Sequence, residues 1–179
     1  GALADVGGVT AVSPDGEVRP QSLGYDPRSY PGSLFNLTQA TGAMEMWRYN
    51  FTGQGVDVAV IDTGIAPISG LADRMKVVVG PDLSFESQNT ATRHLDTYGH
   101  GTAIAAIIAG RDTGIKGAKS YMQDKSNFTG MAPDSRIVSL KLADRGGAVD
   151  VSQMVAAIDW VVQHKNSNGL DIKVLNLSY

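Results

Sequence analysis

Cysteine is absent from the 179-residue chain, and so are long apolar runs and clusters of basic side chains. Without cysteine, neither a disulfide nor a thiolate metal site can form. No apolar run reaches the roughly 20 residues that a helix needs to cross a bilayer, so we expect no membrane partner. The net charge is −3. Because phosphate binding requires clustered Lys and Arg, we expect no nucleic-acid partner.

The chain instead alternates strand-like and helix-like segments. Residues 56–61 are β-branched and apolar nearly throughout and lie between glycines, which is typical of a central parallel strand buried on both faces. This alternation predicts an α/β fold with a parallel sheet flanked by helices. The other strands are expected at 75–79, 136–142 and 172–177, and the helices at 43–49, 102–109 and 151–165. The chain ends directly after a strand, so we expect the sheet to be incomplete in this chain.

The remaining segments carry fewer periodic apolar residues. In residues 1–21, apolar residues on either side of a Ser-Pro-Asp-Gly turn predict an N-terminal arm of two short strands. Residues 22–37 contain or adjoin three prolines and predict an extended linker. Residues 111–129 are polar and predict a surface loop. The helix at 102–109 is apolar around its whole circumference, which predicts complete burial.

Two side chains are candidates for catalysis. Asp62 directly follows the best strand, and His100 begins the buried helix within Gly99-His100-Gly101. Reactive groups in open α/β sheets lie at the carboxyl ends of strands. The flanking glycines allow backbone or substrate to come close. We therefore expect Asp62 and His100 to converge at one edge of the sheet.

Together these residues could carry out nucleophilic catalysis. A neutral histidine can take a proton from a hydroxyl nucleophile and return it to a leaving amine. A neighbouring carboxylate stabilises the imidazolium form and fixes the ring tautomer. We interpret Asp96 and Asp134 as loop and turn residues. Asp57, unusual within a strand, is expected either to face solvent at an edge or to pair locally.

Four segments resemble the subtilase family, in the order in which that family has them. The match covers roughly residues 40–179. The segments are Val58-Ala59-Val60-Ile61-Asp62-Thr63-Gly64-Ile65, Gly99-His100-Gly101-Thr102, the stretch from Gly130 to Leu142, and Val174-Leu175-Asn176-Leu177-Ser178. The resemblance implies a subtilisin-like serine endopeptidase that is secreted, with residues 38–179 as the N-terminal portion of its catalytic domain. Residues 1–21 resemble the tail of a propeptide, which implies a zymogen.

The resemblance also assigns a substrate-binding site. Ser178 and Tyr179 would offer backbone to a bound peptide, and Gly146 and Gly147 would lie on the opposite strand. The peptide or protein substrate would then add as a strand between them. The loop at 111–129 does not keep the calcium-loop pattern of compact subtilisins, so we expect neither a metal nor another cofactor.

The sequence departs from the family in one important respect. It contains no Gly-Thr-Ser-Met-Ala-like segment, so the nucleophilic serine is expected in a C-terminal part of the domain that this chain lacks. This missing part is the second expected partner, and the chain alone should be inactive. A smaller departure is Ala103, where family members usually have a second histidine.

Two other functions stay open from the sequence. A pseudoprotease, or an inactive fragment that acts as a peptide-binding module, would explain the missing serine but not the retained Asp62 and His100. An aspartic protease would explain Asp62-Thr63-Gly64, since that motif also carries the paired carboxylates of that class. However, Ile65 fits that class poorly, and the motif around His100 would have no explanation.

Overall fold

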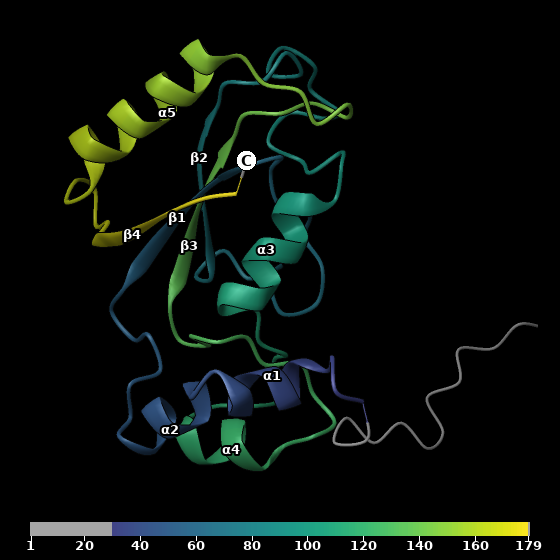
Figure 1. Cartoon of the computed structure of the whole chain (residues 1–179). Helices are drawn as coiled ribbons and strands as arrows, with labels where there is room; N and C mark the ends of the chain where they lie inside the picture. Colours follow the sequence, from purple (N-terminus) through teal and green to yellow (C-terminus); the bar gives the residue numbers. More distant parts are fainter. Residues whose placement is uncertain (1–29, 179) are drawn as a thin grey trace, which may run out of the picture.

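The computed structural model describes residues 30–178, which form an α/β fold around a parallel sheet of four strands (Figure 1). The strands lie in the order β2-β3-β1-β4, and all pairs are parallel. The N-terminal arm predicted for 1–21 and residue Tyr179 lie outside the described residues. The elements are α1 (Leu34–Ala40), α2 (Ala43–Arg48), β1 (Asp57–Asp62), β2 (Val77–Asp82), α3 (His100–Ala109), α4 (Ala118–Gln123), β3 (Arg136–Lys141), α5 (Val151–His164) and β4 (Ile172–Leu177).

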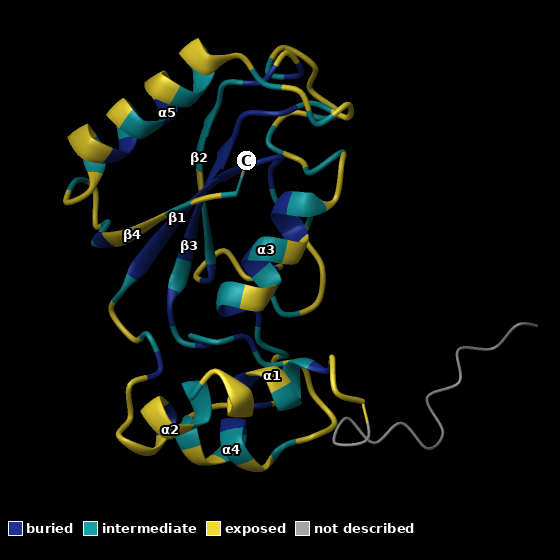
Figure 2. Cartoon of the chain, in the orientation of Figure 1, coloured by how far each residue is buried: buried dark blue, intermediate teal, exposed yellow. Residues whose placement is uncertain are grey.

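The central position predicted for the strand at 56–61 is confirmed. β1 pairs with β3 on one side and β4 on the other, and every residue of it is buried (Figure 2). Its side chains alternate between two cores, as the two-residue period of a strand requires. Ala59 and Ile61 pack with Ala157 of α5. Val58 and Val60 pack with Ala105 of α3 on the opposite face, which completes three layers.

Two of the predicted elements need correction. The second strand begins at Val77 rather than at 75, because its pairing with β3 starts there and Met75 is 74% exposed. The helix predicted at 102–109 is not buried all round, since Ile107 is 44% exposed and Ala103 is exposed. The strand predicted at 172–177 is confirmed as β4, which lies at an edge of the described sheet with most of its residues exposed.

Three short helices form a separate cluster at one end of the sheet (Figure 1). The linker prediction for 22–37 is wrong at 34–37, which belong to α1, because the Ser33 side chain caps that helix at Asn36 N. The surface loop predicted at 111–129 contains α4, where Tyr121 is buried. Tyr121 packs edge-on against Trp47 of α2, with 5.9 Å between ring centroids. The local sequence does not predict this contact, because the two residues are far apart in the chain.

An ion pair joins the amino ends of three strands. Arg136 donates two hydrogen bonds of 2.6 Å to the carboxylate of Asp57, which lies directly opposite in the ladder. Asp171, just before β4, donates its backbone N–H to the same carboxylate. Burial alone would raise the pKa of Asp57, but these hydrogen bonds and the charge of Arg136 hold it below its usual range. Of the two expectations for Asp57, local pairing is confirmed and exposure to solvent is wrong.

A second buried ion pair lies at the carboxyl end of β3. Lys141 is 1% exposed, and its Nζ donates to Glu86 Oε2 at 2.5 Å and to the carbonyl of Leu95 at 2.6 Å. Thr97 adds a hydrogen bond to the same Glu86 oxygen. The loop between β2 and α3 is therefore tied to the end of the sheet by buried charge.

Replacing Lys141 with methionine should leave the buried Glu86 without its buried cation, and only the exposed Arg145 at 3.8 Å would remain as an ionic partner. Breaking a buried ion pair from one side costs about 3–5 kcal/mol of stability. The matched control is Lys173→Met, since Lys173 forms an exposed pair with Asp171, and exposed pairs contribute about 0–1 kcal/mol. Urea denaturation of the two variants measures the difference. Equal stabilities would contradict the importance of the Lys141–Glu86 pair.

Lys76 is a buried cation at the start of β2. It is 8% exposed, and its Nζ donates to the carbonyls of Pro133 and Ser135 at 2.5 and 2.8 Å. Burial, and after it the charge of Arg111, lowers the pKa of Lys76 to about 8 against the opposing effect of the nearby carboxylates of Asp134 and Asp73. The folded protein therefore releases this proton at a lower pH than the unfolded chain does.

The contribution of Lys76 to stability should consequently rise with pH. Between about pH 8 and about pH 10 the unfolded chain binds more protons at this site than the folded protein, so the free energy of unfolding increases. We expect the urea midpoint of the Lys76→Met variant to lose this increase, while the exposed Lys116→Met variant retains it. If Lys76→Met shows the same pH slope as the unmodified protein, another group is responsible.

Candidate active site

Asp62 is held at the carboxyl end of the central strand. Its side chain is only 2% exposed, and its Oδ1 accepts the backbone N–H of Thr63 at 2.7 Å. The chain then turns at Gly64, whose φ of +103° is a left-handed conformation that favours glycine. The buried strand thus fixes where the carboxylate lies, and the glycine allows the backbone of residues 94–96 to lie directly against the turn.

His100 is the first residue of α3 and faces this carboxylate. Its Nδ1 lies 2.8 Å from Asp62 Oδ1 and 2.9 Å from Oδ2. The convergence expected from two motifs 38 positions apart is therefore present in the structure. The imidazole is 41% exposed while the carboxylate is buried. With Nδ1 occupied by Asp62, Nε2 is the nitrogen left to exchange a proton with a reacting group.

The close approach of α3 to β1 depends on Gly101. A Cβ at this position would collide with the carbonyl oxygen of Gly64 and would lie 3.0 Å from Asp62 Oδ1. The Gly101 N–H also donates to Thr63 Oγ1 at 2.9 Å. The glycines that flank His100 were expected to allow backbone or substrate to come close, and here the close contact is between the two segments that carry Asp62 and His100.

Asp96 has more contacts than the loop role assigned to it would require. Its carboxylate accepts hydrogen bonds from the Thr63 and Thr102 hydroxyls and from the Gly99 N–H. Burial alone would raise the pKa of Asp96, but the hydrogen bonds hold it below its usual range. Its position shortly before a helix start was the available sequence signal, since aspartate there often caps a helix.

The predicted substrate-binding residues lie on both sides of Asp62. Gly146 and Gly147 follow β3, and Ser178 follows β4, while β1 lies between these two strands. The Ser178 hydroxyl accepts a hydrogen bond from Asn176 at 2.8 Å. Gly147 has a φ of +75°, and a Cβ there would lie 3.0 Å from the Tyr98 ring. Gly146, Gly147 and Ser178 therefore follow the carboxyl ends of the two strands that flank β1, which itself ends at Asp62.

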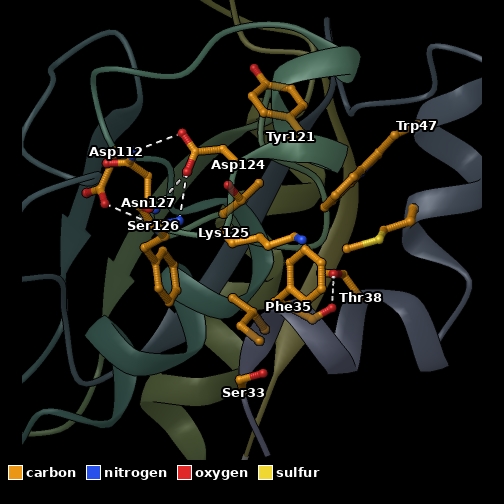
Figure 3. A pocket seen from close by; sticks show the side chains of 14 residues that line it. Ser33, Phe35, Thr38, Trp47, Asp112, Tyr121, Asp124, Lys125, Ser126 and Asn127 are labelled. Atoms are coloured by element: carbon orange, nitrogen blue, oxygen red, sulfur yellow. Dashed lines mark hydrogen bonds between the residues drawn. The ribbon is translucent and has the colours of Figure 1, made fainter. Parts of the chain in front are cut away.

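A cavity of about 270 Å³ lies elsewhere, among the short helices (Figure 3). Its wall includes Phe35, Trp47 and Tyr121, and Asp124 beside it accepts three hydrogen bonds from its own loop. None of the predicted site residues lines it. Within residues 30–178, no group of three His, Asp or Glu is placed to hold a metal ion, and no helix is long and apolar enough to cross a membrane.

Comparison with known proteins relates this site to one family. A family model described as the subtilase family matches residues 53–179. Serine protease AprX of Bacillus subtilis (strain 168) is 30% identical over 146 residues, which are 80% of this chain and 30% of that protein. Minor extracellular protease Epr of the same organism is 27% identical over 133 residues, covering 74% of this chain and 17% of that protein.

A solved structure, that of a cold-adapted subtilisin-like serine proteinase, aligns with a TM-score of 0.46 and 30% sequence identity. The alignment covers 64% of this chain and 34% of that one. The chain thus spans less than a third of the length of the two relatives named above. Since the family model covers well over half of the chain, the protein belongs to the subtilase family.

Proposed function

We propose that the protein supplies the aspartate and histidine of a serine endopeptidase. The observation that carries this proposal is the 2.8 Å contact between Asp62 Oδ1 and His100 Nδ1 at the carboxyl end of the central strand. Asp62 holds the ring in the tautomer that leaves Nε2 as the base. His100 then takes the proton of a serine hydroxyl and later donates it to the leaving amine, and Asp62 stabilises the imidazolium in between.

The serine belongs, in this proposal, to a further part of the catalytic domain outside the chain. β4 offers a place for that part, because it lies at the edge of the described sheet with Val174 49%, Leu175 36% and Leu177 39% exposed. An edge strand with apolar side chains pairs readily with a further strand. The partner of this chain is therefore the remainder of its own domain.

The substrate is an extended peptide or protein segment that lies across the carboxyl ends of the strands. The backbone at Gly146 and Gly147 flanks Asp62 on one side, and that at Ser178 flanks it on the other. Tyr179 is proposed as the next residue to offer backbone to the peptide. An extended peptide placed between two such segments can add as a strand, with main-chain hydrogen bonds supplying affinity. Secretion of the enzyme is part of the proposal, because one relative is an extracellular protease by its name.

An aspartic protease fits the geometry less well. That chemistry needs two carboxylates that share a proton, whereas both oxygens of Asp62 lie within 2.9 Å of His100 Nδ1. A peptide-binding module without catalysis would need neither side chain, and no contact in the described residues favours it over the endopeptidase.

Substitution of His100 and Asp62 in the complete protease tests the proposal. We expect His100→Ala to abolish nearly all peptide hydrolysis and Asp62→Asn to lower kcat by about 10⁴-fold, since the asparagine favours the wrong tautomer. His164→Ala is the matched control, because His164 stacks on Trp160 of α5. Near-normal turnover by His100→Ala, measured with a fluorogenic peptide, would refute the assignment.

Gly101→Ala probes the spacing between the two segments. The added methyl group must displace α3 from Gly64, and a misplacement of about 1 Å costs about 10²-fold in rate. We expect kcat of the complete protease to fall by about this factor. Gly114→Ala serves as the control, since a Cβ there meets no atom within 4 Å. Equal rates for both variants would show that the close approach is dispensable.

A further inference from the structure

Asp96 lies at the junction of the two segments that hold Asp62 and His100. Its Oδ1 accepts hydrogen bonds from Thr63 Oγ1 at 2.8 Å, Tyr98 N at 3.0 Å and Gly99 N at 2.7 Å. Its Oδ2 accepts two from Thr102, at 2.8 Å from N and 2.5 Å from Oγ1. Five donors therefore converge on one carboxylate, which makes this group the most heavily hydrogen-bonded acid near the site.

The hydroxyl groups of Thr63 and Thr102 connect the segment after β1 with the first turn of α3. Thr63 follows β1, and its Oγ1 accepts the N–H of Gly101 in α3 at 2.9 Å. Thr102 belongs to α3, and its Oγ1 accepts the N–H of Ala66 after β1 at 2.9 Å. Each hydroxyl has one proton, and both threonines donate it in a hydrogen bond to the Asp96 carboxylate. With their protons directed to Asp96, the oxygens are left to accept a backbone N–H from the other segment.

This arrangement also replaces the missing cap of α3. The N-cap residue Gly99 has no side chain to satisfy the free N–H groups of the first helical turn. Asp96 binds the N–H groups of Gly99 and Thr102 instead, and a negative charge is favourable at this end of a helix. The carboxylate is thus ionised and fixed from both sides at neutral pH.

We propose that Asp96 is a positioning residue, which acts through the Thr63 and Thr102 hydroxyls to hold His100 against Asp62. A cap alone would stabilise α3 without fixing where it lies. The two crossed hydrogen bonds fix it relative to β1, because each one joins the segment that follows Asp62 to the first turn of the helix that begins with His100. The effect on turnover rests on the proposed endopeptidase function, whereas the effect on the Asp62–His100 contact does not.

The matched variants are Thr63→Val, which removes the hydroxyl at nearly constant shape, and Thr63→Ser, which keeps it. Asp96→Asn is the third variant. The asparagine amide would point N–H groups at some of the groups that donate hydrogen bonds to Asp96, and two donors cannot bond to each other. In the full-length protease with ¹⁵N-labelled histidine, the proton on His100 Nδ1 reports the contact with Asp62. We expect its NMR resonance to broaden in Thr63→Val and Asp96→Asn through exchange with water, and to return in Thr63→Ser.

Kinetics on a peptide substrate give the second readout. We expect Thr63→Val to lower kcat by about tenfold to a hundredfold, as small misplacements do, while KM changes by less than about threefold because the peptide-binding edge is untouched. Thr63→Ser should recover most of the lost kcat. A rise in KM with unchanged kcat would overturn the positioning role.

The outcomes separate the two proposals. If the resonance stays sharp in both Thr63→Val and Asp96→Asn, Asp96 does not position His100. If the resonance responds as expected but the unmodified full-length protein hydrolyses no peptide, the positioning role stands and the endopeptidase proposal falls. Thermal melts identify any variant that fails to fold. If Asp96→Asn fails to fold, the comparison of Thr63→Val with Thr63→Ser decides whether the hydrogen bond to Asp96 positions His100.

Discussion

The parallel alignment of β1 between β3 and β4 is the constraint on which the site depends. Because the three strands run in one direction, their carboxyl ends meet at a single edge, with Asp62 opposite Lys141 and Ile61 opposite Leu177. β1 is buried on both faces, against α3 and α5, and a slip of one residue would move Asp57 away from Arg136, its ion-pair partner directly opposite in the ladder. The position of Asp62 therefore follows from the core.

Carboxylates at this edge differ in what they do because they differ in their partners. Asp62 faces an imidazole that is partly open to solvent. Asp96 accepts only neutral hydroxyl and backbone donors, which suits a group that fixes geometry. Glu86 is neutralised by the buried Lys141 and anchors the intervening loop. One loop thus runs from an ion pair at the sheet, past Asp96, to His100, and the buried charge of Glu86 on it is offset by Lys141.

Several features were predictable from local patterns, and others were not. The order of strands and helices, the central place of β1 and the pairing of Asp62 with His100 followed from apolar runs, glycines and two motifs. α4 was missed because its stability comes from Tyr121 packing on Trp47, 74 positions away in the chain. The exposure of Ile107 was missed because an all-apolar helix carries no sign of which face is covered. Asp96 was interpreted as a loop residue, since its hydroxyl donors come from two different segments.

The sequence by itself determined the fold class, the family resemblance and the identity of the candidate catalytic pair, because hydrophobic period and short motifs are local properties of the chain. Tertiary structure alone decided how that pair is held. The collision that excludes any side chain at Gly101, the crossed hydroxyl bonds to Asp96 and the burial of Lys141 all join residues from separate elements. Such contacts exist only after the core has packed, because packing is what brings the donors of one element within hydrogen-bonding distance of the acceptors of another.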